Sequence, residues 1–139
     1  MPSSGATRRA IVAGHAGFAA GLISAVEKVS GRSGVFRGLT NDGCDAATLE
    51  TALRAALAEH GARVVFTDLP AGSCTVAARR IAHGDPDLAV VTGATLPMLL
   101  DFALGSDGSV DLRAALARAA TRGRDAITVT PPREDACGD

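Results

Sequence analysis

A single histidine lies near the start of the chain, where an apolar run gives way to a helical pattern. The segment from Ala10 to Ala19 reads AIVAGHAGFA, so His15 is in a Gly-His-x-Gly turn. Open α/β sheets bind their ligands at the carboxyl ends of their strands, which is where this pattern places His15. The next helix would point its N-terminus at the same turn, and the positive end of a helix dipole favours anions such as phosphate. We therefore expect His15 to be the centre of the functional site.

A carboxylate and a hydroxyl follow a later apolar run and can complement the histidine. Asp68 and Ser73 are the two ends of a turn that reads DLPAGS. A carboxylate that accepts a hydrogen bond from one imidazole nitrogen leaves the other free as a nucleophile, and it stabilises positive charge on the ring. We expect Asp68 to do this, with Ser73 and nearby backbone N–H groups holding a phosphoryl group. In simpler interpretations His15 is an ordinary surface residue, Asp68 caps its own turn and Ser73 is only a helix N-cap.

The alternation of strand and helix patterns predicts the sheet that would bring these residues together. Runs that are apolar on both faces indicate buried parallel strands, and single apolar stripes indicate helices. The expected strands span 9–13, 34–39, 63–67, 88–91 and 126–130, and the expected helices span 18–30, 45–60, 73–82, 95–104 and 110–121. This order predicts an α/β fold: one domain with a mainly parallel, doubly wound sheet and helices on both faces. The carboxyl edge of that sheet would also gather Asn41, Asp42 and the segment from Thr92 to Thr95.

Several boundaries follow from single residues. Asp45 and Thr95 are predicted N-caps, and Gly123 is predicted to stop the last helix. Residues 1–8 are small and polar and are expected to be loose, the domain is expected to span 9–130, and the polar tail 131–139 is expected to be disordered.

Composition excludes several classes of function. The chain of 139 residues has a formal net charge of -1 and lacks Trp and Tyr, which gives no electrostatic or stacking basis for binding nucleic acid. Its three cysteines, Cys44, Cys74 and Cys137, have neither CxxC nor Cys/His spacing, so no metal site and no disulfide framework are expected. No apolar run approaches the ~20 residues of a spanning helix, and no signal-peptide core is present, so we expect a cytoplasmic protein.

The common cofactor and nucleophile motifs are also missing. Gly14, Gly17 and Gly21 do not form GxGxxG, and the one lysine, Lys28, belongs to a predicted helix and not to a P-loop. Ser73 lacks the flanking residues of a GxSxG elbow. No organic cofactor is therefore expected, and a small hydrolase that uses Ser73 with His15 and Asp68 stays open only as an alternative.

Three blocks of sequence resemble the enzyme IIA domain of the mannose-type sugar phosphotransferase system. These are IVAGHAGFA at 11–19, DLPAGS at 68–73 and GATLPML at 93–99, and TRGR at 121–124 resembles the segment before that family's last strand. The blocks occur in the family's order and approximate spacing, over residues 9 to 130.

The resemblance implies a cytoplasmic phosphocarrier that can be peripheral to a membrane transporter. The family histidine, matched by His15, accepts a phosphoryl group from the histidine phosphocarrier protein and passes it to a IIB component, here a separate protein, for uptake through membrane IIC and IID components. The aspartate that orients the family histidine matches Asp68, and the serine of the Gly-Gly-Ser turn matches Ser73. Family members are homodimers whose last strand pairs with the partner's sheet, so residues 126–130 are expected to be an antiparallel, exchanged strand.

The sequence departs from the family pattern at three positions. Ala71 and Cys74 replace a glycine and a proline of the Gly-Gly-Ser-Pro turn, and Thr95 replaces an asparagine. These changes leave a phosphorylation-dependent regulatory module open as an alternative. The phosphotransfer subunit that feeds dihydroxyacetone kinase is a second alternative, although the Leu96-Pro97-Met98 block favours the mannose-type branch.

Overall fold

Four parallel strands and five helices make up residues 7–133, the part of the chain that this computed structural model describes. The strands are β1 (Ala10–Gly14), β2 (Phe36–Thr40), β3 (Val64–Thr67) and β4 (Ala89–Val91). The helices are α1 (Phe18–Ser30), α2 (Ala46–His60), α3 (Ser73–His83), α4 (Leu96–Leu104) and α5 (Leu112–Asp125). The strands lie in the order β2-β1-β3-β4, which confirms the predicted parallel α/β domain.

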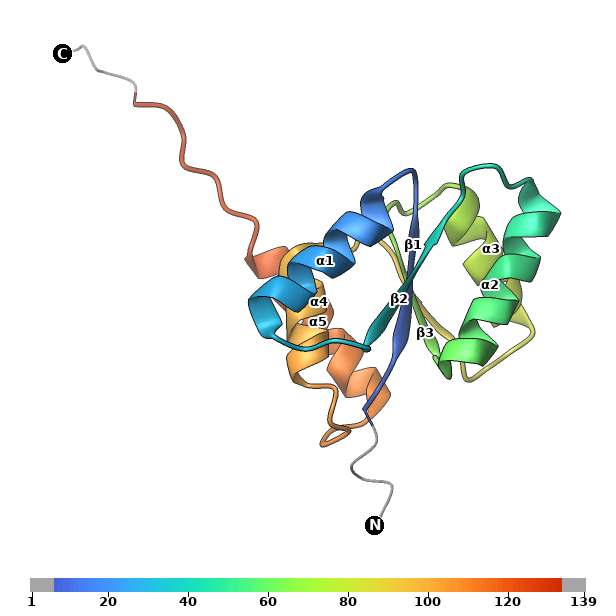
Figure 1. Cartoon of the computed structure of the whole chain (residues 1–139). Helices are drawn as coiled ribbons and strands as arrows, with labels where there is room; N and C mark the ends of the chain where they lie inside the picture. The colour runs from blue at the N-terminus through green and yellow to red at the C-terminus, as the bar shows by residue number, and fades with distance from the viewer. Residues whose placement is uncertain (1–6, 134–139) are drawn as a thin grey trace.

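The helices divide between the two faces of the sheet, as a doubly wound fold requires. Helices α1, α4 and α5 cover one face, and α2 and α3 cover the other (Figure 1). The strand β1 is central, with Ile11 beside Arg37 of β2 on one edge and beside Val65 of β3 on the other. Strand order reverses between β1 and β3, and such a reversal opens a crevice at the carboxyl ends of these strands.

Two apolar cores hold the layers together. Alternate side chains of β1 point to opposite faces, so Val12 belongs to the core under α1 and α4, whereas Ile11 belongs to the core under α2 and α3. In the first core Phe66 packs on Phe102, with 5.2 Å between ring centroids. The turn that carries His15 extends directly from β1, which is fully buried on both faces.

The predicted helix caps at Asp45 and Thr95 are confirmed. The Asp45 carboxylate accepts a hydrogen bond from the Thr48 N–H at 2.8 Å, and the Thr95 hydroxyl accepts one from the Met98 N–H at 3.4 Å. The strand boundaries differ from the predicted ones by one or two residues.

The prediction that Gly123 stops the last helix is wrong, because α5 continues to Asp125. Gly123 is buried against α4, and a Cβ at this position would lie 3.2 Å from both the Thr95 Oγ1 and the Met98 Cε atoms. This glycine therefore allows α5 to approach α4 closely, and its role is in packing.

The predicted strand at 126–130 is absent from this single chain. The segment is extended and leads away from the domain (Figure 1), and Ile127 and Val129 are 74% and 83% exposed. A strand needs a neighbour to pair with, and the described part of this chain supplies none to the segment. Exchange with a second subunit stays a prediction.

The expectations for the two ends fall largely outside the described residues, which exclude 1–6 and 134–139. Within the described part, the backbone N–H of Arg8 donates to the Ser106 carbonyl at 2.7 Å. None of the helices among residues 7–133 has the length and apolar character needed to cross a membrane.

Candidate functional site

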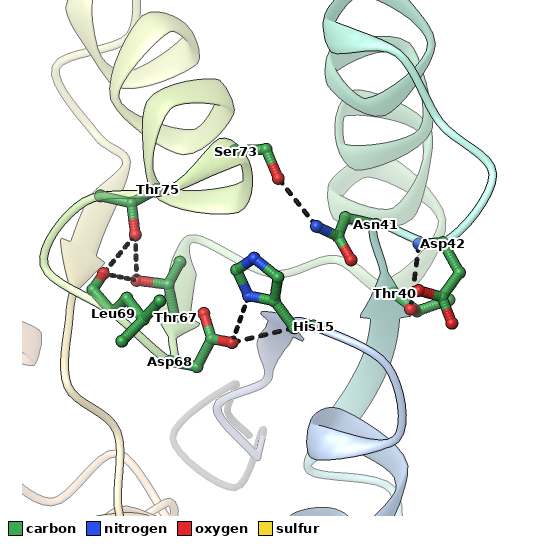
Figure 2. Close-up of polar contacts among 9 residues, drawn as sticks. All are labelled: His15, Thr40, Asn41, Asp42, Thr67, Asp68, Leu69, Ser73 and Thr75. Carbon is green, nitrogen blue, oxygen red and sulfur yellow. Dashed lines mark hydrogen bonds and ion pairs between the residues drawn. The ribbon is translucent and has the colours of Figure 1, made fainter.

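The carboxyl ends of β1 and β3 lie side by side and bring His15 and Asp68 together. The two strands pair in parallel up to Ala13 and Thr67, so the residues that follow them lie at the same edge of the sheet. The Asp68 Oδ2 atom accepts two hydrogen bonds from His15, one from the backbone N–H at 2.9 Å and one from the ring Nδ1 at 2.8 Å (Figure 2). One carboxylate oxygen therefore fixes both the backbone and the ring of the histidine.

The environment of Asp68 keeps its carboxyl group ionised. Burial alone would raise its pKa, but the hydrogen bonds from the backbone and ring of His15, together with the charge of that ring, hold the pKa below its ordinary value. An ionised carboxylate only accepts hydrogen bonds, so the Nδ1 of His15 carries the proton. The Nε2 atom is left with the lone pair in the neutral ring. The His15 side chain is 49% exposed, and that of Asp68 only 12%.

The turn after β1 has a tight geometry that directs the histidine. Ala16 has a φ of 48°, in the left-handed region, and the Phe18 N–H donates to the His15 carbonyl at 3.0 Å. The helix α1 starts at Phe18, with Gly17 as its N-cap and no side-chain capping bond. His15 therefore lies in a reversal of the chain and is followed at once by a helix N-terminus, as the sequence predicted.

Ser73 is the first residue of α3, and the interpretation of Ser73 as a side-chain N-cap is wrong. Gly72 holds the N-cap position with a φ of 132°, a backbone conformation that favours glycine, and it lies beside the ring of His15. The Ser73 Oγ instead accepts a hydrogen bond from the Asn41 Nδ2 at 2.9 Å. Figure 2 shows these two residues on the side of the imidazole that carries Nε2.

Two buried threonines brace the loop that carries Asp68. The Thr67 and Thr75 hydroxyl oxygens are 2.7 Å apart, and the Thr75 hydroxyl donates to the Leu69 carbonyl at 2.6 Å (Figure 2). Both threonines are at most 1% exposed. Sequence reasoning considered Thr75 only as a helix start, because nothing in the spacing reveals a hydroxyl pair across a loop.

The other polar residues predicted at this edge have different positions. Asp42 forms a local turn in which its backbone N–H donates to the Thr40 hydroxyl at 3.2 Å (Figure 2). Thr95 caps α4 beside Gly123. The candidate site therefore comprises the His15–Asp68 pair and the nearby Asn41–Ser73 pair.

Cys74 is a packing residue, as the sequence suggested. It is 1% exposed, and burial together with the negative charge of Asp68 raises the pKa of its thiol to about 11, with a smaller opposing contribution from Ser73. A thiol with this pKa is protonated near neutrality and is a poor nucleophile. Across residues 7–133, no group of three or more His, Cys, Asp or Glu side chains is arranged to hold a metal ion.

Comparison with known proteins gives one family. The model of the family described as PTS system fructose IIA component matches residues 9–119. A solved structure from Klebsiella pneumoniae subsp. pneumoniae MGH 78578, assigned to a phosphoenolpyruvate-dependent sugar phosphotransferase system (PTS) permease, is 25% identical with a TM-score of 0.78. That alignment covers 93% of this chain and 95% of the other.

Two further solved structures share the fold at lower identity. The mannose/sorbose specific IIA subunit from Enterococcus faecalis is 21% identical, with a TM-score of 0.76 over 92% of this chain and 98% of the other. The PTS IIA protein associated with the fucose utilization operon of Streptococcus pneumoniae is 24% identical, with a TM-score of 0.72. That alignment covers 83% of this chain and 90% of the other. A search of curated proteins finds no match.

Proposed function

Because the chain belongs to the family of PTS system fructose IIA components, we propose that it is a phosphocarrier whose His15 accepts and passes on a phosphoryl group. The donor is the histidine phosphocarrier protein, and the acceptor is a separate IIB component that serves membrane IIC and IID components in sugar uptake. On this proposal the protein works in the cytoplasm, at times beside the transporter.

The observation that carries the proposal is the pairing of His15 Nδ1 with the ionised Asp68 at 2.8 Å. The lone pair of Nε2 attacks the phosphorus atom of the donor, a new N–P bond forms, and the bond from phosphorus to the donor nitrogen breaks with its electron pair returning to the donor. The imidazole gains positive charge during this step, and Asp68 stabilises that charge at short range. Because Nδ1 keeps its proton throughout, the reverse transfer follows the same path.

The start of α3 supplies hydrogen-bond donors for the phosphoryl oxygens. Ser73 is the first helical residue, and the first backbone N–H groups of a helix have no partner within it. The Ser73 hydroxyl lies beyond the Nε2 side of the ring (Figure 2), where a phosphoryl group would be attached. A helix N-terminus also stabilises negative charge through its dipole.

The test is phosphoryl uptake measured as intact mass. The protein is incubated with phosphoenolpyruvate, enzyme I and the histidine phosphocarrier protein, and its mass is recorded at alkaline pH, where phosphohistidine persists. The expected result is a gain of one acid-labile phosphate that is absent in His15→Ala and present in His83→Ala, the matched change at an exposed histidine of α3. No uptake with demonstrably active donor proteins would overturn the proposal and favour the regulatory alternative.

A homodimer is part of the same proposal, with residues 126–130 as the exchanged strand. The alternating apolar residues Ile127 and Val129 are both exposed in the single chain, as a strand awaiting a partner sheet would leave them. Sedimentation should give the mass of a dimer, and the double change Ile127→Asp and Val129→Asp should give a monomer. If the wild-type protein sediments as a monomer at high concentration, the homodimer is ruled out, and the proposed phosphocarrier role is not affected.

A further inference from the structure

We infer that Asn41 is a positioning residue of the phosphoryl site, and that it acts by fixing the Ser73 hydroxyl as a hydrogen-bond donor to the phosphoryl group. The inference rests on the proposed function and deepens it, because it adds a residue from the loop after β2 to a site otherwise built from the loops after β1 and β3. It starts from the 2.9 Å hydrogen bond that the Asn41 Nδ2 donates to the Ser73 Oγ.

The backbone of Asn41 is held on both sides, so its side chain projects from a fixed point. Its N–H donates to the Gly14 carbonyl at 3.2 Å, which extends the β1–β2 pairing to the residue just before His15. Its carbonyl accepts a hydrogen bond from the Cys44 N–H at 3.1 Å. These two hydrogen bonds fix the backbone from which the amide extends, beside the histidine turn although it follows a different strand.

The direction of the Asn41–Ser73 hydrogen bond decides what the hydroxyl can do. A serine hydroxyl has one proton to donate and two lone pairs to accept. When the Asn41 amide N–H occupies a lone pair of the Ser73 Oγ, the hydroxyl proton remains available for another acceptor. The Ser73 side chain also interacts with the neighbouring Cys74 thiol, whose pKa it lowers slightly, so Cys74 is the competing partner for the hydroxyl proton.

A phosphoryl oxygen would be the strongest acceptor for that proton. The neighbouring Cys74 is a weaker one, because burial raises the pKa of its thiol to about 11 and so keeps it neutral. Hydrogen bonds with an ionised partner are roughly twice as strong as those between neutral groups. A hydroxyl that already accepts a hydrogen bond is also a better donor, since chains of hydrogen bonds polarise one another.

The experiment measures phosphoryl transfer to the whole protein from the phosphorylated histidine phosphocarrier protein, with rates followed by rapid quench. The variants are Asn41→Ala, Ser73→Ala and the double variant, with Asp42→Ala as the matched control because Asp42 is adjacent and exposed. We expect Asn41→Ala to lower kcat about tenfold with little change in KM for the donor protein, less than the ~100-fold that a donor in direct contact can contribute. In the Ser73→Ala background, Asn41→Ala should have no further effect.

Asn41→Asp separates positioning of the hydroxyl from a purely structural bridge. An aspartate keeps the size of the side chain and can still hydrogen-bond to Ser73, but only as an acceptor, so it draws the hydroxyl proton away from the phosphoryl group. We expect Asn41→Asp to be at least as slow as Asn41→Ala in the presence of Ser73. The effect of the added negative charge is measured separately, by the same change in the Ser73→Ala background.

Two outcomes would overturn the inference. Additive losses for Asn41→Ala and Ser73→Ala would show that the two residues act independently, and a near-normal rate for Asn41→Asp would show that Asn41 only bridges two loops. Circular dichroism and urea unfolding identify any variant that is not folded. If the wild-type protein accepts no phosphate, the proposed function fails; if it does and the Asn41 variants match it, this inference alone fails.

Discussion

Gly14 and Asp68 lie so close together that a Cβ on Gly14 would be 2.9 Å from the Asp68 Oδ2. The same Cβ would be 2.7 Å from a ring carbon of Phe18. The Phe18 ring and the carboxylate that binds His15 therefore together occupy the space that a methyl group on Gly14 would need.

We expect Gly14→Ala to displace Asp68 and to lower the rate of His15 phosphorylation by about 100-fold, because a shift of the order of 1 Å at a reacting group has effects of this size. Overpacking should also lower the free energy of unfolding by about 1–3 kcal/mol. Gly17→Ala is the matched change, since a Cβ there meets no atom within 4 Å. Rapid-quench kinetics and urea unfolding measure both effects. Equal rates for the two variants would contradict the steric argument.

Asp68 should stabilise the fold in a pH-dependent way. Its pKa is below the ordinary 3.8 in the folded protein because of the hydrogen bonds from His15, which outweigh the effect of burial. A carboxyl group with a lowered pKa adds stability above its unfolded pKa, and that stability is lost as the pH falls through the folded pKa. The difference in free energy of unfolding between wild type and Asp68→Asn should therefore have its largest value at pH 5–6 and become smaller below about pH 4. A difference that grows with acid would have the wrong sign.

The Thr75 hydroxyl should contribute to stability out of proportion to its size. Thr75→Val keeps the shape of the side chain but removes the donor to the Leu69 carbonyl and the partner of the Thr67 hydroxyl. Thr67 can still donate to the Leu69 carbonyl at 3.4 Å, so the expected effect is the loss of the two short hydrogen bonds of Thr75, which should lower the free energy of unfolding by about 1–3 kcal/mol, measured by urea titration. Thr51→Val, at an exposed position of α2, should change it by no more than about 0.5 kcal/mol. A neutral effect at Thr75 would mean that the hydroxyl pair is dispensable.

Two helical glycines should respond in opposite ways to alanine. Gly21 of α1 has open space around its Cα, so Gly21→Ala should raise the free energy of unfolding by about 0.5–1 kcal/mol through helix propensity. Gly123→Ala should lower it by about 1 kcal/mol, because the new methyl group meets Thr95 and Met98 at 3.2 Å. Thermal unfolding of both variants is sufficient, and a stabilised Gly123→Ala would show that α4 and α5 can separate without cost.

The sequence was sufficient to predict those features that depend on local pattern. The fully apolar run of β1, the stripes of the helices and the caps at Asp45 and Thr95 each follow from spacing within a few residues. Parallel order then places His15 and Asp68 at one edge, and the geometry shows that they are in contact.

The features that were missed depend on contacts between distant segments. A glycine near a helix end usually indicates that the helix stops there. Gly123 is instead needed for the close packing of α5 on α4, and this contact between distant segments has no signal in the local sequence. The alternation of Ile127 and Val129 is typical of a strand, and whether residues 126–130 pair with a second subunit stays a prediction. Asn41 and Ser73 are 32 residues apart, and neither has a motif that predicts the other.

The half exposure of His15 has a kinetic consequence for a carrier of this kind. On the proposed function, the donor protein and the acceptor protein must each reach the same Nε2 atom, so they compete for one surface and are not bound productively at the same time. Transfer then follows a ping-pong scheme, and an excess of either unphosphorylated partner slows turnover by occupying the surface unproductively. The ratio of the two partners, more than the chemistry at the ring, would set the flow of phosphate through this protein.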